Sequence, residues 1–124
     1  VKMNITAVFT KEQVQSILEN INTDSPHIIS IFAGRIADTG LDPVLIMKES
    51  LEIIKSKSEN LQLLWASPRE VLNVYQANEI GCDIITITTP LLNKLKLKDK
   101  DLSEYSLETV KMFYDDAQKV GYKL

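Results

Sequence analysis

The stretch LQLLWASPRE, residues 61–70, combines a strand signal with a helix-start signal. Residues 61–66 are nearly all apolar, which is typical of a short buried strand. Ser67 and Pro68 resemble a helix cap followed by proline at the first helical position, and Glu70 would complete a capping box. The stretch therefore predicts one strand followed directly by one helix. Three side chains of that helix are expected to face inward: Val71, Leu72 and Tyr75.

The same pattern occurs twice upstream of this stretch. Residues 3–9 form a β-branched run that predicts a strand, and apolar spacing predicts an amphipathic helix over residues 11–21. Residues 27–32 predict the next strand, residues 34–41 a loop, and the residues after 43 a second helix. The capping residues that support these two helices are Thr10 with Gln13, and Asp42 with Pro43.

The pattern also continues downstream. Residues 83–88 predict a fourth strand, and a short helix is expected from Thr89 to Leu95. A charged stretch over residues 96–104 then leads to a last helix over about 107–120. Its apolar stripe is compatible with ordinary packing or with docking on a neighbouring molecule: Leu107, Val110, Phe113, Ala117 and Val120.

Four strands, each followed by a helix, predict parallel pairing through right-handed crossovers. The strands are nearly all apolar rather than alternating, which is typical of sheets covered on both faces. The fold class is therefore α/β. The periodicity alone leaves flavodoxin-like and barrel arrangements open.

Composition excludes several classes of protein. The chain has 124 residues, 44% of them hydrophobic and 25% charged, with a formal net charge of −3. This balance gives no reason to expect a nucleic acid or an anionic membrane as partner. No apolar run is long enough for a bilayer, and no signal peptide is recognisable. The single cysteine, Cys82, makes a reducing cytoplasmic location the natural expectation.

Polar side chains that could bind a ligand follow the predicted strands. Ligands of α/β folds bind outside the carboxyl ends of the strands, where threonines 86, 88 and 89 also occur. The only two arginines of the chain, Arg35 and Arg69, both lie in this position. With Ser67 beside Arg69, the pattern favours an anion site for phosphate or carboxylate. The alternative is that Ser67 is only a cap and that both arginines form surface ion pairs.

Other polar residues favour structural roles. His27, the only histidine, starts a strand and so lies at the end away from the predicted site. Cys82 has no histidine or second cysteine nearby and is expected to be a small buried side chain. We expect neither a metal site nor an organic cofactor, because no ligand cluster or glycine-rich phosphate motif is recognisable.

Three ordered motifs resemble the transaldolase family, and its small transaldolase and fructose-6-phosphate aldolase branch in particular. They are residues 4–9 (NITAVF), 29–36 (ISIFAGRI) and 65–70 (WASPRE), and residues 102–121 resemble the terminal helix of that branch. The resemblance implies a (β/α)8 barrel, a Schiff-base lysine on the fourth strand, and transfer of a dihydroxyacetone unit between phosphosugars in pentose phosphate metabolism.

The resemblance also implies roles for individual residues. Thr6 matches the threonine that helps to place the catalytic water, and Ser30 and Phe32 match positions in the wall of the active site. Three further residues match the cluster that binds the substrate phosphate: Arg35, Ser67 and Arg69. This agrees with the anion site argued from chain position.

The sequence departs from the family pattern in one respect. Its motifs belong to family strands five to eight, so the strand with the Schiff-base lysine and the acidic residues of the first and third strands are not in this chain. Lys2 shares strand parity with Thr6 but lies roughly 13 Å toward the other end of the strand, where we expect it to be solvated. We therefore expect the C-terminal half of a barrel, with four strand–helix units over residues 1–100 and a terminal helix over 101–124.

Such a half-barrel is expected to be inactive alone. Its unpaired strand edges and the exposed apolar interior of the half-barrel predict self-association into a homo-oligomer, to which the terminal helix contributes. The alternative function is a non-catalytic phosphosugar-binding or structural module.

Overall fold

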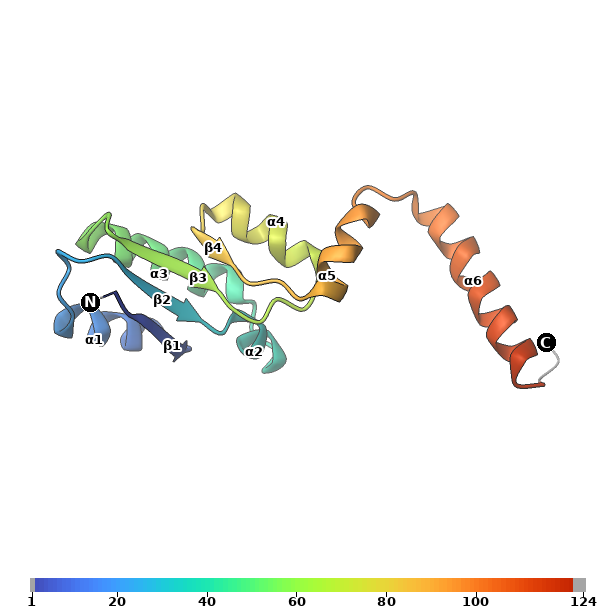
Figure 1. Cartoon of the computed structure of the whole chain (residues 1–124), viewed down its shortest axis with the longest axis horizontal. Helices are drawn as coiled ribbons and strands as arrows, with labels where there is room; N and C mark the ends of the chain where they lie inside the picture. Colours follow the sequence, from blue (N-terminus) through green and yellow to red (C-terminus); the bar gives the residue numbers. More distant parts are fainter. Residues whose placement is uncertain (1, 122–124) are drawn as a thin grey trace. The chain divides into compact units, whose positions relative to one another are not determined.

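The computed structural model describes residues 2–121, which fold into alternating strands and helices (Figure 1). The strands are β1 (Asn4–Val8), β2 (His27–Ile31), β3 (Leu61–Trp65) and β4 (Ile84–Ile85). The helices are α1 (Lys11–Asn20), α2 (Ala33–Asp38), α3 (Pro43–Lys57), α4 (Val71–Ile80), α5 (Thr89–Lys94), the short 3-10 helix η1 (Leu95–Leu97) and α6 (Leu102–Lys119).

The four strands form one parallel sheet in the order β1-β2-β3-β4. Neighbours along the chain are therefore neighbours in the sheet, which confirms the predicted parallel pairing. A doubly wound sheet of the flavodoxin type reverses its strand order, whereas a barrel adds its strands in sequence. The observed order therefore matches four consecutive units of a barrel.

The hydrophobic core lies between the sheet and the helices α1, α3 and α4 (Figure 1). Alternate residues of β2 and β3 supply its centre and are at most 1% exposed: Ile29, Ile31, Leu61, Leu63 and Trp65. The other face of these strands carries Ser30 and Gln62 among apolar residues. The helices lie on one face of the sheet, and on the other face Ser30 and Leu64 are buried while Ile28 and Gln62 are half-buried.

Two predicted helix starts were placed correctly. Thr10 caps α1 in a reciprocal capping box with Gln13, and the side chain of Asp42 caps α3 with Pro43 in its first turn. In both cases a short polar side chain accepts a backbone N–H that the helix itself leaves unpaired.

The predicted loop over residues 34–41 is wrong over its first half, which forms α2. Gly34 and Gly40 resemble loop residues in the sequence, but only Gly40 has left-handed backbone, with φ of 88°. Gly34 is buried inside α2 instead, for a packing reason given below.

The predicted helix start at Ser67 is also wrong, because α4 begins at Val71 with Glu70 as its cap. Ser67 has a φ of 60°, which no helical residue adopts. The side chain that accepts backbone N–H groups before the helix is that of Asn73, and not that of Glu70 as predicted. Asn73 Oδ1 accepts the backbone N–H groups of Arg69 and Glu70. The helix also turns Leu72 outward, where it is 58% exposed, contrary to the prediction.

Two further predicted boundaries are wrong in the second half of the chain. The strand predicted over residues 83–88 is regular only at Ile84 and Ile85. The last helix begins at Leu102 instead of about 107, because Asp101 caps it by accepting the N–H of Glu104. The charged stretch thus contains a helix start.

The chain divides into two compact units, Val1–Asn93 and Lys94–Leu124. The first contains the sheet and its core. The second contains η1 and α6, and no residue of α6 is buried. In the part of the chain that the structure describes, no helix is both long enough and apolar enough to cross a membrane.

His27 is buried and Cys82 is half-buried, and both form hydrogen bonds to neighbouring segments. His27 is 2% exposed; its Nδ1 accepts the N–H of Met3 and its Nε2 lies 2.9 Å from the carbonyl oxygen of Asn22. The thiol of Cys82 donates to the carbonyl oxygen of Leu63, and burial raises the pKa of the thiol above its ordinary value. Both side chains therefore join neighbouring segments.

Candidate functional site

The candidate site lies where β1 to β4 end and their connecting segments begin. On the first two strands, Ser30 Oγ donates a hydrogen bond of 2.6 Å to Asn4 Oδ1. Pairing of Ile5 with Ile29 places Thr6 next to Ser30. Ser30 is buried, whereas Thr6 is exposed. Two predicted site residues, Thr6 and Ser30, are thus neighbours across the strands.

The sequence prediction missed Asn4. Its signal was strand parity, because Asn4 lies two residues before Thr6 and so belongs to the same face of β1. The backbone beyond Thr6 is irregular: the register shifts between Ile5 and Val8, and Ala7 has a φ of 58°. A bulge with strained backbone is a frequent feature of functional sites.

Phe32 stands between β2 and α2, as the cap residue of α2. Its ring packs against Phe9 with centroids 6.0 Å apart and a tilt of 49°. Its backbone N–H donates to the carbonyl oxygen of Val8. The two rings thus lie together at the ends of neighbouring strands.

Gly34 brings α2 against the segment between β3 and α4. Its N–H donates to the carbonyl oxygen of Ala66, and a Cβ at Gly34 would lie 1.7 Å from the carbonyl oxygen of Ser67. Only glycine can approach another backbone this closely. The contact brings Arg35, the next residue of α2, to the neighbourhood of Ser67.

Arg69 is held at both its main chain and its side chain. Its backbone N–H donates to Asn73 Oδ1 at 2.9 Å, and its Nη2 donates to Asp38 Oδ2 at 3.1 Å. The side chain of Arg69 is still 52% exposed. The remaining N–H groups of the guanidinium are therefore available to an anion in solvent.

A cleft of about 280 Å3 unites Ser67 and Arg69 with the residues after β4. Its lining residues are Ser67, Pro68, Arg69, Thr86, Ile87 and Thr88. The backbone N–H of Thr86 donates to the carbonyl oxygen of Trp65, which keeps the two strand ends together. One guanidinium and three hydroxyl-bearing residues around a cleft are donors suited to an oxyanion.

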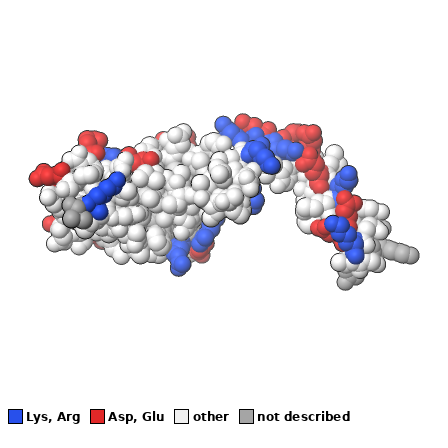
Figure 2. All heavy atoms as spheres, in the orientation of Figure 1, with Lys and Arg blue, Asp and Glu red and all other residues white. Residues whose placement is uncertain are grey.

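The structure does not gather all the predicted site residues around this cleft. Arg35 is exposed on α2, and Thr6, Ser30 and Phe32 belong to the β1–β2 end of the sheet. The helix-free face of the sheet, which joins these two groups, is largely without charged side chains (Figure 2). The predicted residues therefore form two neighbouring clusters.

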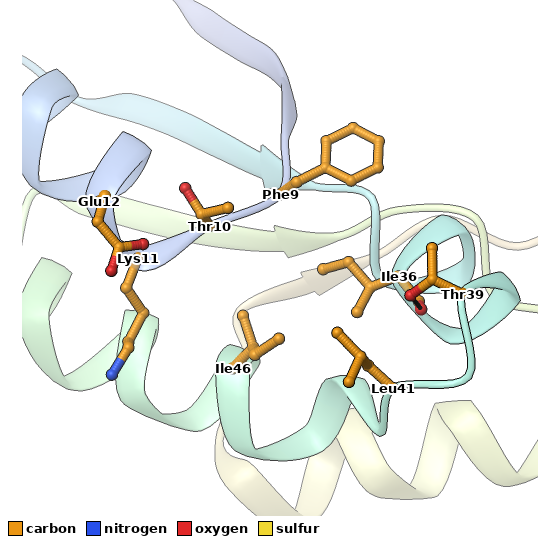
Figure 3. Close-up of a pocket in the computed structure, with 8 residues that line it drawn as sticks. All are labelled: Phe9, Thr10, Lys11, Glu12, Ile36, Thr39, Leu41 and Ile46. Carbon is orange, nitrogen blue, oxygen red and sulfur yellow. Dashed lines mark hydrogen bonds between the residues drawn. The ribbon is translucent and has the colours of Figure 1, made fainter.

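A second cavity, of about 290 Å3, lies between the start of α1 and the α2–α3 segment (Figure 3). Its lining is mostly apolar and contains none of the predicted site residues: Phe9, Thr10, Lys11, Glu12, Ile36, Thr39, Leu41 and Ile46. Within residues 2–121, no group of three or more side chains is arranged to hold a metal ion.

Comparisons with known proteins point to one family. The model of the family described as Transaldolase/Fructose-6-phosphate aldolase matches residues 1–124. A protein of Mesorhizobium japonicum with the name "Probable transaldolase" is 36% identical over 96 residues, which are 75% of this chain and 42% of that protein. A protein of the same name from Bdellovibrio bacteriovorus is 27% identical over 126 residues, or 99% of this chain and 53% of that protein.

A third such protein, from a Thermoanaerobacter species, is 26% identical over 124 residues and is covered to 53%. The chain thus spans about half the length of the curated relatives that it matches. Its four parallel strand–helix units in sequential order correspond to half of a (β/α)8 barrel. With a family match over its whole length, the chain belongs to the transaldolase/fructose-6-phosphate aldolase family.

Proposed function

We propose that this chain is the phosphate-binding half of a transaldolase-like barrel. Ser67, Arg69 and Arg35 bind the phosphate of a phosphosugar, and the family reaction is Schiff-base transfer of a dihydroxyacetone unit in pentose phosphate metabolism. The observation that carries the proposal is the cleft at the ends of β3 and β4, in which Ser67 and Arg69 meet. The close contact of Gly34 with Ser67 supports a contribution from Arg35.

The chemistry of these side chains favours a phosphate over a neutral group. The planar fork of an arginine matches two oxygens of a phosphate at once, and hydroxyl groups donate to the others. Arg69 uses Nη2 for its contact with Asp38, which leaves part of the fork unoccupied by protein. Ser67 and Thr86 add donors from two different segments.

Thr6, Ser30 and Phe32 would face the reacting part of the sugar. In this proposal Thr6 positions the catalytic water, while Ser30 and Phe32 form part of the wall. The hydrogen bond between Ser30 and Asn4 supports a fixed orientation of the Ser30 hydroxyl. Asn4 then joins the same wall.

The chain alone is proposed to be inactive. A Schiff base requires an amine held neutral in a desolvated pocket. Lys2 is exposed and precedes β1, and Lys55 on α3 donates to the carbonyl oxygen of Leu61 and pairs with Asp83. No strand that the structure describes carries a lysine. This observation favours the second candidate function, a non-catalytic phosphosugar-binding or structural half-barrel.

We also propose that the chain self-associates in a reducing cytoplasm. The outer edges of β1 and β4 pair with no strand of the described chain, and such edges recruit other strands. The stripe of α6 adds exposed apolar surface, with Phe113 62% exposed. Light scattering at micromolar concentration should give a mass above that of one chain, and a monomer would contradict self-association.

Titration with fructose 6-phosphate tests the proposed phosphate site. Arg69→Ala and Arg35→Ala should each weaken binding about tenfold, the loss expected for one charge-assisted contact. Lys48→Ala removes a charge from an exposed position on α3 and should leave binding unchanged. Fructose without phosphate should bind neither the parent chain nor the variants. Equal affinity of the parent chain and both arginine variants would contradict the site.

Borohydride trapping separates the two candidate functions. The chain is incubated with fructose 6-phosphate as dihydroxyacetone donor, reduced, and examined by mass spectrometry. We expect no covalent adduct, because no strand in the described residues carries a lysine. An adduct would overturn the proposed inactivity and identify the lysine. Binding without an adduct supports a phosphosugar-binding half-barrel, and absence of both would leave only the structural role.

A further inference from the structure

Asp38 closes α2 and contacts Arg69 across 31 residues of sequence. Its Oδ2 accepts the hydrogen bond from Arg69 Nη2 at 3.1 Å, and the two groups form an ion pair. We propose that Asp38 is a positioning residue for the phosphate site: it fixes the guanidinium of Arg69 so that the unoccupied N–H groups face the cleft. This inference rests on the phosphate-binding function proposed above.

Arg69 needs such a contact because only its main chain is held by the helix that follows. Asn73 accepts the backbone N–H of Arg69, which fixes the position of the Cα atom and leaves the side chain free to rotate. An arginine side chain loses rotamer entropy when it is immobilised. A carboxylate that holds one nitrogen of the guanidinium covers part of this cost before an anion arrives.

Asp38 can act in this way because α2 is itself anchored to the same segment. The N–H of Gly34 donates to the carbonyl oxygen of Ala66, and Gly34 is in close contact with Ser67. Asp38 therefore approaches Arg69 from a helix that already touches the wall of the cleft. The two contacts together make α2 a support for the cleft rather than a passive connection.

A carboxylate near an anion site also repels the anion, so the two effects of Asp38 must be weighed. The side chains of Asp38 and Arg69 are 57% and 52% exposed, and solvent screens the repulsion between exposed charges strongly. The orientation of the fork depends on a direct hydrogen bond at 3.1 Å, which acts only through contact. The positioning role requires that this orienting effect outweigh the repulsion, and the phosphate affinity of Asp38→Ala decides which of the two is larger.

The test uses the two arginines of the chain as reporters. Side-chain Nε–H signals in 15N NMR are assigned with Arg35→Lys and Arg69→Lys, and inorganic phosphate is titrated into each protein. Asp38→Ala should weaken phosphate binding about three- to fivefold, the equivalent of an exposed ion pair. Asp38→Asn keeps an acceptor oxygen and loses the charge, so its affinity should lie within about twofold of the parent value.

The matched control is Asp24→Ala, which removes the same charge in the exposed loop before β2, at the opposite ends of the strands. It should not change the phosphate affinity or either signal. Without phosphate, Asp38→Ala should shift the Arg69 signal and leave the Arg35 signal in place. Rescue by Asp38→Asn distinguishes orientation from charge.

Each outcome decides the inference. Phosphate affinity in Asp38→Ala that equals or exceeds the parent value, while Arg69→Ala still loses binding, would overturn the positioning role and leave the phosphate site intact. Equal affinity of the parent chain and Arg69→Ala would overturn the proposed function, and the inference with it. Loss in Asp38→Ala with rescue in Asp38→Asn supports both.

Discussion

The helices α1 and α6 carry the same kind of apolar stripe but differ in what covers it. In α1, Val14 is 0% exposed and Leu18 is 6% exposed, because the stripe packs into the core of the sheet unit. In α6, Leu107 is 72% exposed and Val110 is 62% exposed. Apolar spacing therefore identifies the face of a helix that is suited to packing, but it does not identify the surface against which that face packs.

The difference has a physical consequence for the two units. Burial of apolar area is the main source of stability, so the sheet unit has its own cooperative core. The unit with η1 and α6 has little burial, and an isolated helix of this length is marginal in water. The two units should therefore respond differently to the same kind of substitution.

Truncating one leucine in each unit should give the largest contrast. Leu63→Ala removes a side chain that is 0% exposed and should cost about 2–5 kcal/mol of unfolding free energy. Leu107→Ala removes an exposed side chain and should change the stability of the sheet unit by less than about 0.5 kcal/mol. Urea denaturation followed by Trp65 fluorescence measures the sheet unit, since Trp65 is the only tryptophan and lies in its core.

The second leucine also reports on self-association. Lower mass of Leu107→Ala by light scattering, with an unchanged Trp65 transition, would mean that another copy covers the stripe of α6. A Leu107→Ala variant that unfolds as early as Leu63→Ala would contradict the division into two units, because it would place α6 in the same cooperative core.

A pair of glycines gives a smaller contrast. Gly34→Ala forces a Cβ to within 1.7 Å of the Ser67 carbonyl oxygen, and the required shift should cost about 1–3 kcal/mol. Gly121→Ala meets no neighbouring atom within 4 Å and strains only its own backbone, at a φ of 83°. The Trp65 transition in urea should move for Gly34→Ala alone. If it does not move, the close contact between α2 and Ser67 is not a constraint.

The correct parts of the sequence prediction rest on local signals. Thr10 with Gln13 and Asp42 with Pro43 are caps whose partners lie within a few residues, so the sequence contains the whole interaction. Parallel pairing followed from the alternation of strands and helices. These features needed no knowledge of distant contacts.

The errors have a non-local cause in most cases. Gly34 suggested a loop because the contact that requires a glycine at this position is with the backbone of Ser67, which lies 33 residues away in the sequence. Ser67 suggested a cap because nothing local announces its left-handed backbone. The start of α6 is different, since Asp101 and Glu104 are a local signal that the charged surroundings concealed.

The difference between local signals and distant contacts also limits the prediction of the site. Position after a strand pointed to Ser67 and Arg69, and in the structure both residues line one cleft. Asp38 could not be found in this way, because its role depends on α2 and on a contact between two connecting segments. The position of a residue after a strand does not identify polar residues that act through another side chain.

The smallest contrast uses two helix caps whose hydrogen bonds have the same length. Thr10 Oγ1 and Asp101 Oδ2 each accept a backbone N–H at 3.1 Å, from Gln13 and Glu104. Thr10→Ala should lower the unfolding free energy of the sheet unit by about 1 kcal/mol. Asp101→Ala should lower the helical signal in far-ultraviolet circular dichroism and leave the Trp65 transition unchanged.

Conservative variants keep this last test specific to capping. Thr10→Ser and Asp101→Asn retain an acceptor at the cap and should behave like the parent chain. Thr10 also belongs to a capping box with Gln13, and Asp101 carries a charge, so the comparison depends on which signal moves in each alanine variant and not on the size of the two losses. The Trp65 transition could shift as much in Asp101→Ala as in Thr10→Ala. That result would show that α6 and the sheet unfold together. The contrast between α1 and α6 would then be one of side-chain exposure and not of stability.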